Sequence, residues 1–371
     1  MDSTLEIIRL LRTHLCEGQT DSVPVPEEEL PVLLRGARRH QLAHLLCRCG
    51  VDCPETRAEE NRAKYRFMLT DYEFRRICAA FEEARIVFLP LKGIVLKREY
   101  PEPWMRTQGD MDILVQDHAG AQAVLSALGY VRREESDHDV SFYLPDGSMH
   151  IELAYTLTVR EDCLWNDCLA RVWDYTKSVP GAEYQRAMEP EFFYFYHIAH
   201  MAKHFSFGGI GIRYFLDLWI MRHRAGICGD ELCAAYGLGA FNDACVRLSE
   251  KWFSGAEGEP PEGFKQAVIA GGIYGISRQR ITFALSKKSR SRYLLSRLFP
   301  SFDYMTTIYP VLKKHKWLLP LMYLVRLFRP LTRERFGGRV KNELSIERNV
   351  TETDRLRAGK MLEELGLAPK K

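Results

Sequence analysis

The spacing of apolar residues changes twice along this chain, and the change restricts the folds that it can adopt. Up to about residue 84 and again after about residue 158, apolar residues recur every three or four positions, which predicts amphipathic helices. Between these points they form short runs bounded by Gly, Pro and Asp, which is typical of strands. We therefore expect an α+β protein, in which a small mixed β-sheet of residues 85–158 lies between an N-terminal helical segment, residues 1–84, and a larger C-terminal helical region, residues 159–371.

The expected elements of residues 85–158 follow a definite order. The run IVFLPL (86–91) predicts a buried strand, and IVLKREY (94–100) predicts a short helix that the following prolines end. Three further stretches complete the segment: a strand at DMDILV (110–115), a helix at HAGAQAVLSALG (118–129), and two strands joined by an Asp-Gly turn in VSFYLPDGSMHIELAY (140–155). This mixture of strands and short helices predicts a compact mixed sheet.

Helices are expected to fill the C-terminal region. The candidates are Glu189–Phe205, Arg213–Arg224, Asp230–Phe253, Pro261–Ile276 and Thr351–Leu365. The glycine pairs Gly208-Gly209, Gly271-Gly272 and Gly337-Gly338 predict breaks between helices. Arg213 and Asp217 are four residues apart, which predicts an ordinary ion pair along one helix.

Composition excludes several classes of protein. With 371 residues, 46% hydrophobic and 27% charged, the chain can bury one large or two medium cores. Its start lacks the basic and apolar stretches of a secretory signal, and its longest apolar stretch, Trp317–Phe328, is too short to cross a bilayer and contains Pro320 and Arg326. The ten cysteines form no C-x-x-C pair, which argues against a zinc finger. We expect a cytoplasmic protein without a transmembrane segment.

Two aspartates in the second expected strand indicate a cation site. Asp110 and Asp112 are two positions apart, so on a strand their side chains project from the same face. Carboxylates that close repel each other, and a divalent cation such as Mg²⁺ or Mn²⁺ relieves the repulsion. Glu152 lies between apolar residues of a later strand and is the candidate third carboxylate of a two-metal site.

Lys92-Gly93 follows the first expected strand directly. Glycine allows a phosphate to approach the backbone, and the start of the next helix offers unpaired N–H donors. Lys92 adds a positive charge, and Arg106 could add a bidentate contact to phosphate.

The order of these features resembles a known family. A strand, a glycine at a helix start, an Asp-x-Asp between apolar residues and a later carboxylate are similar to the nucleotidyltransferase superfamily typified by DNA polymerase β. More closely, LKGIVLKREYPEPWMRTQGDMDILV (91–115) resembles an uncharacterised bacterial nucleotidyltransferase family with the pattern Leu-Lys-Gly, Tyr-Pro, Arg and Gly-Asp-x-Asp-x-Leu-Val. The resemblance covers residues 91–157, and residues 197–218 are similar to the helices that follow in that family. Gly-Ser or Gly-Gly is usual at the helix start in the superfamily, and the serine is missing here.

The resemblance implies an enzyme that moves a nucleoside monophosphate from a nucleoside triphosphate, such as ATP, to an acceptor hydroxyl or phosphate and releases pyrophosphate. Asp110, Asp112 and Glu152 would be the catalytic metal ligands, and Lys92 and Gly93 would line the triphosphate. Glu152 could act as ligand, as base or as both. The nucleotide and the acceptor stay open: a saccharide precursor, a small molecule, RNA and protein all fit.

Three histidines share one face of the expected helix Glu189–Phe205, namely His197, His200 and His204. No cysteine or carboxylate completes a transition-metal site beside them. We interpret His200, Lys203 and His204 as contacts to phosphate or base, with plain packing as the alternative.

Residues 278–341 form a basic stretch, which contains sixteen Lys or Arg and only two acidic residues. Three interpretations are open: a solvated helical surface, a surface for RNA or another polyanion, and a surface for an anionic membrane.

Two functions compete with the leading one. The first is a non-catalytic scaffold protein that binds nucleotides or polyanions, which three intact carboxylates argue against. The second is a toxin-like nucleotidyltransferase acting on tRNA, which only the basic stretch supports.

Overall fold

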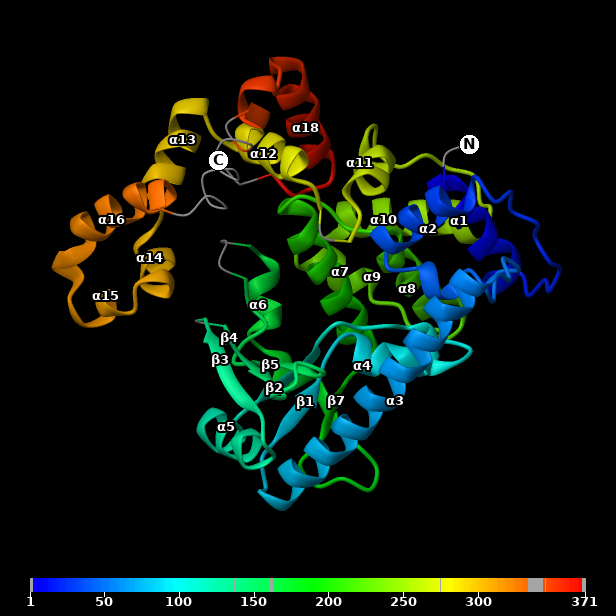
Figure 1. The fold of residues 1–371 in the computed structure, drawn as a ribbon, viewed down its shortest axis with the longest axis horizontal. Helices are drawn as coiled ribbons and strands as arrows, with labels where there is room; N and C mark the ends of the chain where they lie inside the picture. The colour runs from blue at the N-terminus through cyan, green and yellow to red at the C-terminus, as the bar shows by residue number, and fades with distance from the viewer. Residues whose placement is uncertain are drawn as a thin grey trace. The chain divides into compact units, whose positions relative to one another are not determined.

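The computed structural model describes residues 3–136, 138–159, 163–273, 275–332, 343 and 345–368 (Figure 1). It confirms the α+β class, with one five-stranded sheet among many helices. Contacts divide the chain into two compact units, of which the first holds residues 1–203 and 211–260 and the second holds residues 204–210 and 261–371. The division into three segments that the sequence suggests stays a prediction.

The central sheet of the first unit has the strand order β1-β2-β5-β4-β3. Its strands are β1 (Phe88–Pro90), β2 (Met111–Val115), β3 (Val131–Glu135), β4 (Asp139–Tyr143) and β5 (His150–Ala154). β2 and β5 are parallel, whereas the pairs β1–β2, β4–β5 and β3–β4 are antiparallel. The sheet is therefore mixed, as expected, and its parallel pair lies in the middle.

One face of the sheet forms the core with two helices, α3 (Pro54–Glu83) and α5 (His118–Ala127) (Figure 1). Strand residues alternate in direction, so Ile113 of β2 and Leu153 of β5 lie in one buried cluster with Phe81 of α3 and Leu125 of α5. The opposite face is left for the side chains at even positions of β2 and β5.

The remaining elements of the first unit are helices and one hairpin. They are α1 (Ser3–Leu10), a π-helix (Leu11–Cys16), α2 (Leu30–Arg39), α4 (Gly93–Leu96), α6 (Trp165–Leu169), the hairpin β6 (Thr176–Ser178) and β7 (Arg186–Met188), α8 (Ile212–His223), α9 (Asp230–Ala235) and α10 (Gly239–Phe253). Short 3₁₀ turns cover Ala43–Leu45, Lys97–Glu99, Pro103–Met105 and Val172–Tyr175. Helix α7 (Pro190–Ser206) begins in the first unit and ends in the second.

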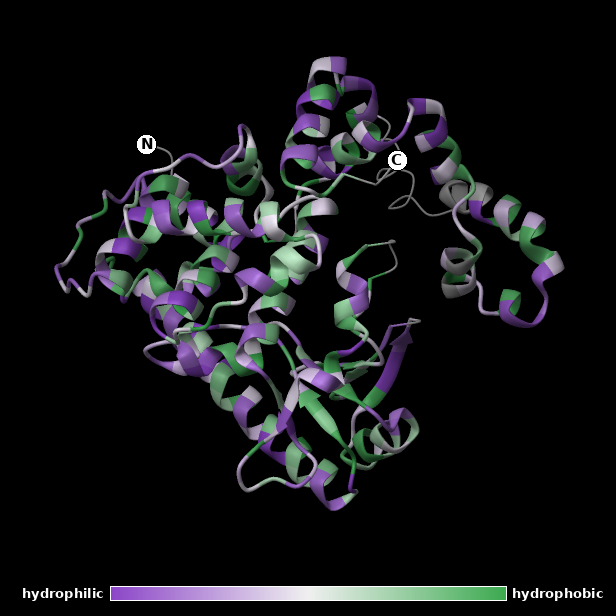
Figure 2. Cartoon of the chain, turned by 180° about the vertical axis from the view of Figure 1, so that it is seen from behind, coloured by the Kyte–Doolittle hydropathy of each residue, from purple (hydrophilic) through white to green (hydrophobic). Residues whose placement is uncertain are grey.

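Three features differ from the expected elements. β3 was not expected because its sequence, VRREE, has no apolar run; it is an exposed edge strand that Figure 2 shows as largely hydrophilic. The hairpin β6–β7 falls in a region expected to be helical. The single helix expected at Asp230–Phe253 is two helices, because Gly237 adopts φ = 78° and ends α9.

The second unit is helical in its described part. Its helices are α11 (Phe264–Gly271), α12 (Ser277–Lys287), α13 (Arg290–Leu298), α14 (Phe302–Ile308), α15 (Val311–Lys314), α16 (Leu319–Thr332) and α18 (Glu352–Glu364), with a 3₁₀ turn at Lys316–Leu318. Gly337-Gly338 and the end of the basic stretch after residue 332 lie outside the described residues. Among the described helices, none is both long enough and apolar enough to cross a membrane.

Candidate active site

The register of the parallel strands places two of the predicted ligands side by side. Asp112 of β2 is paired with Glu152 of β5. Both side chains project from the face of the sheet opposite the α3–α5 core, since their neighbours Ile113 and Leu153 are buried in that core.

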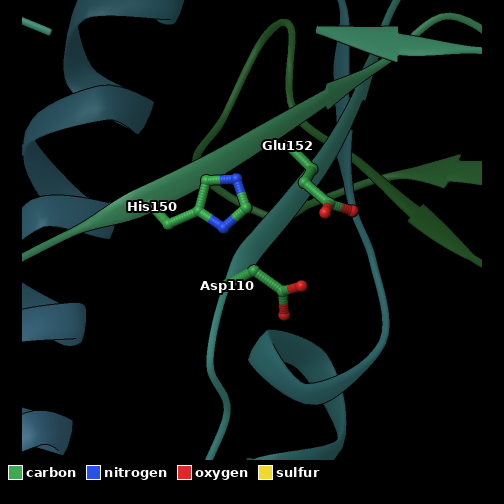
Figure 3. Close-up of side chains that lie close together, drawn as sticks. All are labelled: Asp110, His150 and Glu152. Carbon is green, nitrogen blue, oxygen red and sulfur yellow. The ribbon is translucent and has the colours of Figure 1, made fainter. Parts of the chain in front are cut away.

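Asp110 lies two residues before Asp112, and His150 lies two residues before Glu152, so both are on the same face of the sheet. Asp110 directly precedes β2, and His150 begins β5. The potential ligand atoms of Asp110, His150 and Glu152 all lie within 4.8 Å of one another. Figure 3 shows the imidazole and the two carboxylates facing a common space. The predicted ligands Asp110 and Glu152 therefore meet, and a histidine joins them.

Lys92 reaches the same face from the neighbouring strand. Its Nζ lies 2.5 Å from Oδ1 of Asp112. The backbone of Lys92 adopts φ = 50°, an unusual value for a residue with a side chain, at the turn between β1 and α4. Strain of this kind persists only where the surrounding structure holds it, and it is concentrated at functional sites.

Negative charge exceeds positive charge at this face. Burial on its own would lower the pKa of Lys92, but the adjacent Asp112 carboxylate outweighs it and holds that pKa well above its usual value. Burial, reinforced by the charge of Asp112, raises the pKa of Glu152 to about 8. Lys92 thus contacts one member of a group of three carboxyl groups, and a bound dication would relieve the repulsion among them and stabilise the ionised form of Glu152. The oxygen-rich donor set fits Mg²⁺ or Mn²⁺.

A pocket of about 90 Å³ opens beside three of these groups, and Asp110 and His150 are not among its lining residues. The turn after β1 contributes Lys92, the sheet contributes Asp112 and Glu152, and α7 contributes side chains at 196, 199, 200 and 203. His200 and Lys203 thus lie at the pocket, where the sequence predicted nucleotide contacts. The nucleotide-binding role itself stays a prediction.

Gly93 and His204 are placed differently from the other predicted residues. Gly93 is buried and does not line the pocket. A Cβ at this position would lie 2.9 Å from Oε1 of Gln108 and 3.1 Å from Nη1 of Arg106. His204 belongs to the second unit and is not among the residues that line the pocket.

Arg106 also lies away from the pocket. Its Nε donates to Oδ1 of Asp217 at 2.6 Å, and both side chains are buried. The hydroxyl of Tyr100 donates to the same carboxylate oxygen at 2.7 Å. The guanidinium is therefore committed to Asp217 rather than directed at a phosphate. The sequence predicted an ordinary ion pair between Arg213 and Asp217 along one helix. In the structure the principal ion pair of Asp217 is instead with Arg106.

Sequence reasoning missed His150 and Tyr196. His150 precedes Glu152 by two residues, so the same alternation that placed Asp110 with Asp112 could have identified it. Tyr196 of α7 is buried at the pocket, where its pKa is raised by burial. No local signal marks it among the aromatic residues of that helix.

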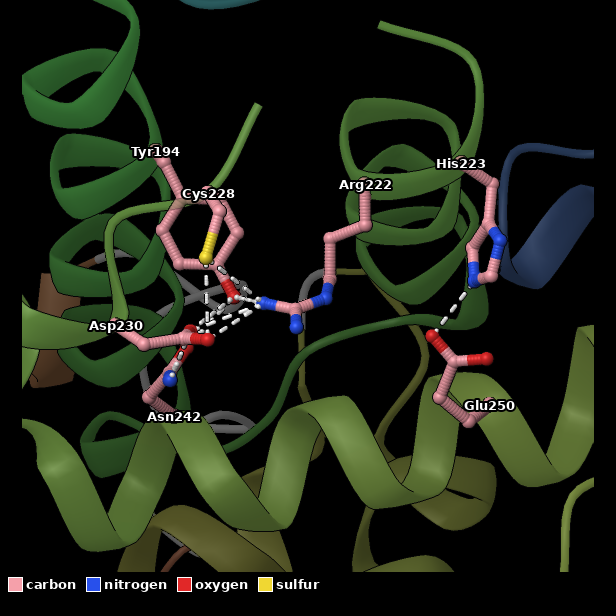
Figure 4. A network of polar contacts seen from close by, with 7 residues as sticks. All are labelled: Tyr194, Arg222, His223, Cys228, Asp230, Asn242 and Glu250. Carbon is pink, nitrogen blue, oxygen red and sulfur yellow. Dashed lines mark hydrogen bonds and ion pairs between the residues drawn. The ribbon is translucent and has the colours of Figure 1, made fainter. Parts of the chain in front are cut away.

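A second polar network lies elsewhere in the first unit (Figure 4). Nη1 of Arg222 donates to the Asp230 carboxylate at 2.9 Å, and Nδ2 of Asn242 donates to it at 2.7 Å. The hydroxyl of Tyr194 donates to Oδ1 of Asn242 at 2.8 Å. These bonds join α7, α8, α9 and α10, and none of the four residues lines the pocket described above. We assign this network a structural role.

Comparisons with known proteins agree with the resemblance. A family model described as "Uncharacterised nucleotidyltransferase" matches residues 26–254. This range includes the whole central sheet and the helices α7 to α10. No curated protein and no solved structure matches the chain.

Proposed function

The chain belongs to the uncharacterised nucleotidyltransferase family, and from this premise we propose that it transfers a nucleoside monophosphate from a nucleoside triphosphate to an acceptor hydroxyl or phosphate, with release of pyrophosphate. The observation that carries the proposal is the pairing of Asp112 with Glu152 on adjacent parallel strands, with Asp110 and Lys92 on the same face.

Divalent cations would be held by Asp110, Asp112 and Glu152. When bound, they supply Lewis-acid stabilisation of the charge that develops on the phosphates. The fit rests on the donor set, because three carboxyl groups share one ammonium and Glu152 has a raised pKa. Glu152 is placed either to hold a cation or to accept the proton of the acceptor.

The triphosphate would lie in the pocket beside the carboxylates. Lys92 neutralises charge on the leaving phosphates, and its Nζ is within reach of both the pocket and Asp112. Lys203 and His200 of α7 line the same pocket. In such a reaction positioning and charge neutralisation provide most of the catalysis.

Gly93 and Arg106 would act through the turn that carries Lys92. Gly93 packs directly on Arg106 and Gln108, and Asp217 anchors Arg106. We propose that these residues position Lys92 rather than touch the nucleotide.

A transfer assay tests the function. Each nucleoside triphosphate, labelled at its α-phosphate, is incubated with the protein, Mg²⁺ or Mn²⁺ and a cell extract, and label on any acceptor is measured. We expect Asp112→Asn and Glu152→Gln to lower transfer by about a hundredfold or more. Glu134→Gln, a matched change on the exposed strand β3, should leave transfer unchanged. Wild-type transfer no greater than that of Asp112→Asn would contradict the proposal.

Nucleotide binding gives a test that needs no acceptor. A non-hydrolysable triphosphate should bind only when Mg²⁺ or Mn²⁺ is present, and Glu152→Gln should weaken the binding. Binding that is indifferent to both the cation and Glu152 would support a non-catalytic nucleotide-binding scaffold instead.

A further inference from the structure

His150 is held in a fixed orientation at the edge of the carboxylate group. It is paired in register with Tyr143 of β4, and its ring stacks on the tyrosine ring with a centroid separation of 4.2 Å and an interplanar angle of 4°. Its Nε2 lies 3.3 Å from Oγ of Ser141. Its Nδ1 makes no hydrogen bond to any residue in the described part of the chain. One ring nitrogen is thus anchored and the other remains available.

The distances allow one cation to contact all three side chains. The ligand atoms of Asp110, His150 and Glu152 lie within 4.8 Å of one another. Two ligands on one ion, each at ~2.1 Å, are at most ~4.2 Å apart. A shift of a few tenths of an ångström in each side chain, on the order of ordinary rotamer adjustment, therefore closes the site around an ion.

We propose that His150 is a nitrogen ligand of the cation held by Asp110 and Glu152, and that this site consequently selects a first-row transition-metal dication over Mg²⁺. The role of the cation in this inference rests on the proposed function. The binding of the cation does not. Mg²⁺ is a hard ion that takes oxygen ligands, whereas imidazole favours transition metals. A nitrogen ligand in place of an oxygen ligand lowers the affinity of the site for Mg²⁺. It raises the affinity for transition metals, and more for Co²⁺ than for Mn²⁺.

The surroundings of His150 match those of a metal-binding histidine. Such histidines are oriented by a hydrogen bond at the nitrogen that does not bind the metal, and loss of that partner lowers metal affinity about ten- to hundredfold. The Ser141 hydroxyl is placed for this role. Ser141 is itself the residue paired with Glu152 across β4 and β5, so one strand pair sets the position of both ligands.

The competing explanation is that His150 only packs against Tyr143 and binds no metal. Another histidine of the protein serves as a control for this explanation. The ring of His118 on α5 lies against that of Tyr155, with a centroid separation of 4.3 Å and an interplanar angle of 34°, but His118 is not part of the carboxylate group. A histidine that only packs on a tyrosine should behave like His118.

The decisive measurement is electron spin-echo spectroscopy of Mn²⁺ bound to the untagged, full-length protein. We expect ¹⁴N modulation from a directly bound imidazole in the wild type and in His118→Gln, and its absence in His150→Gln. Wild-type Mn²⁺ spectra without ¹⁴N modulation, or modulation that persists in His150→Gln, would overturn the proposal. A wild-type spectrum without ¹⁴N modulation decides the question even if a variant fails to fold.

Metal competition supplies the selectivity test. We expect Co²⁺ to displace Mg²⁺ from the wild-type protein, and His150→Gln to lower Co²⁺ affinity about ten- to hundredfold while Mg²⁺ affinity changes less than about threefold. Ser141→Ala keeps the imidazole, so it should retain the ¹⁴N modulation and lose about tenfold in Co²⁺ affinity. Equal losses of Mg²⁺ and Co²⁺ affinity in His150→Gln would contradict the selectivity.

The two proposals fail in different ways. A protein with ¹⁴N modulation but no nucleotidyl transfer would retain the metal site and refute the proposed function. A protein with Mg²⁺-supported transfer and no ¹⁴N modulation would retain the function and refute the nitrogen ligand.

Discussion

Nζ of Lys92 lies 2.5 Å from Oδ1 of Asp112, and their side chains are only 27% and 8% exposed. The contact joins the turn after β1 to the middle of β2. Since two further carboxyl groups lie on the same face, this ammonium is the positive charge that the structure places against them. Its removal should therefore affect stability as well as nucleotide binding.

We expect Lys92→Met to lower the free energy of unfolding by about 2 kcal/mol in the absence of divalent cations, because Asp112 is left buried without its partner. Mg²⁺ or Mn²⁺ should restore more stability to this variant than to the wild type. Thermal unfolding in EDTA and with each metal checks this. Lys360→Met removes an exposed helix pair with Glu364 and should change stability by less than about 0.5 kcal/mol. Equal unfolding temperatures of Lys92→Met and wild type in EDTA would be the contrary result.

Gly93→Ala should reduce nucleotidyl transfer with little loss of fold. The added Cβ would lie 2.9 Å from Oε1 of Gln108 and 3.1 Å from Nη1 of Arg106, which is held by Asp217. We expect the turn carrying Lys92 to shift by a few tenths of an ångström, and the transfer rate to fall by about tenfold, because a shift of about 1 Å can cost a hundredfold. Gly359→Ala on α18 is the control, because a Cβ there makes only an ordinary contact, 3.8 Å from Cβ of Ser286. Transfer rates and circular dichroism of both variants check this, and similar rates for the two would refute a positioning role for the turn.

The Arg106–Asp217 pair should dominate the stability of its surroundings. We expect Asp217→Asn to cost about 3–5 kcal/mol, because it leaves a buried guanidinium without its counter-charge. Tyr100→Phe removes a single hydrogen bond to the same oxygen and should cost about 1.5–3 kcal/mol. Urea unfolding of these variants checks the order of the losses. Replacing both charges, as in Arg106→Met with Asp217→Leu, should be less damaging than Asp217→Asn alone; a larger loss in the double variant would contradict the argument.

Acid should destabilise the protein partly through His44. Burial lowers the pKa of His44 to about 4, although its Nε2 hydrogen-bonds the Met105 carbonyl at 2.7 Å. Its pKa in the unfolded chain is about 6.5, so between these values the unfolded state binds more protons and stability falls as the pH falls. The contribution is fully present above pH 6.5 and lost below pH 4, a span of about 3 kcal/mol. Between pH 7 and pH 5, His44→Gln should lose less stability than wild type by about 2 kcal/mol in urea unfolding; equal losses would count against this assignment.

The described part of the basic stretch exposes apolar side chains as well as charge. Trp317 is 76% exposed, and Leu321 and Leu324 on α16 are also exposed. Leu321 and Leu324 are three residues apart and share one side of α16, and Trp317 lies in the 3₁₀ turn that precedes this helix. Apolar side chains beside lysines favour an anionic membrane surface over RNA among the interpretations of residues 278–341.

We therefore expect the protein to bind vesicles that contain anionic lipid, less strongly as salt increases, and to bind neutral vesicles weakly. Trp317→Ala combined with Leu321→Ser should reduce sedimentation with vesicles. Leu356→Ser on α18, which changes a side chain that is 67% exposed, serves as control. Salt-sensitive binding to RNA with no vesicle binding would support the polyanion interpretation instead.

Local sequence patterns predicted four of the five strands of the sheet. Short apolar runs and the Asp-Gly turn predicted β1, β2, β4 and β5; β1 and β2 are buried throughout, whereas burial alternates along β5. The two-residue period of strand side chains put Asp110 and Asp112 on one side. β3 escaped prediction because an exposed edge strand needs no apolar residues.

The assembly of the site depended on contacts between distant parts of the chain. The parallel register of β2 and β5 brings Glu152 beside Asp112, and the Arg106–Asp217 pair spans 111 positions of sequence. Nothing local in the sequence indicates that Arg106 faces Asp217 rather than a phosphate.

The sequence by itself therefore determined the α+β class, the main strands, and the side of its strand on which each carboxylate lies. The tertiary structure alone decided that His150 joins Asp110 and Glu152, that Lys92 bonds Asp112, and that Gly93 packs on Arg106 and Gln108. The physical reason is that side-chain direction along a strand follows from backbone geometry, whereas strand neighbours and register depend on long-range hydrogen bonds and packing.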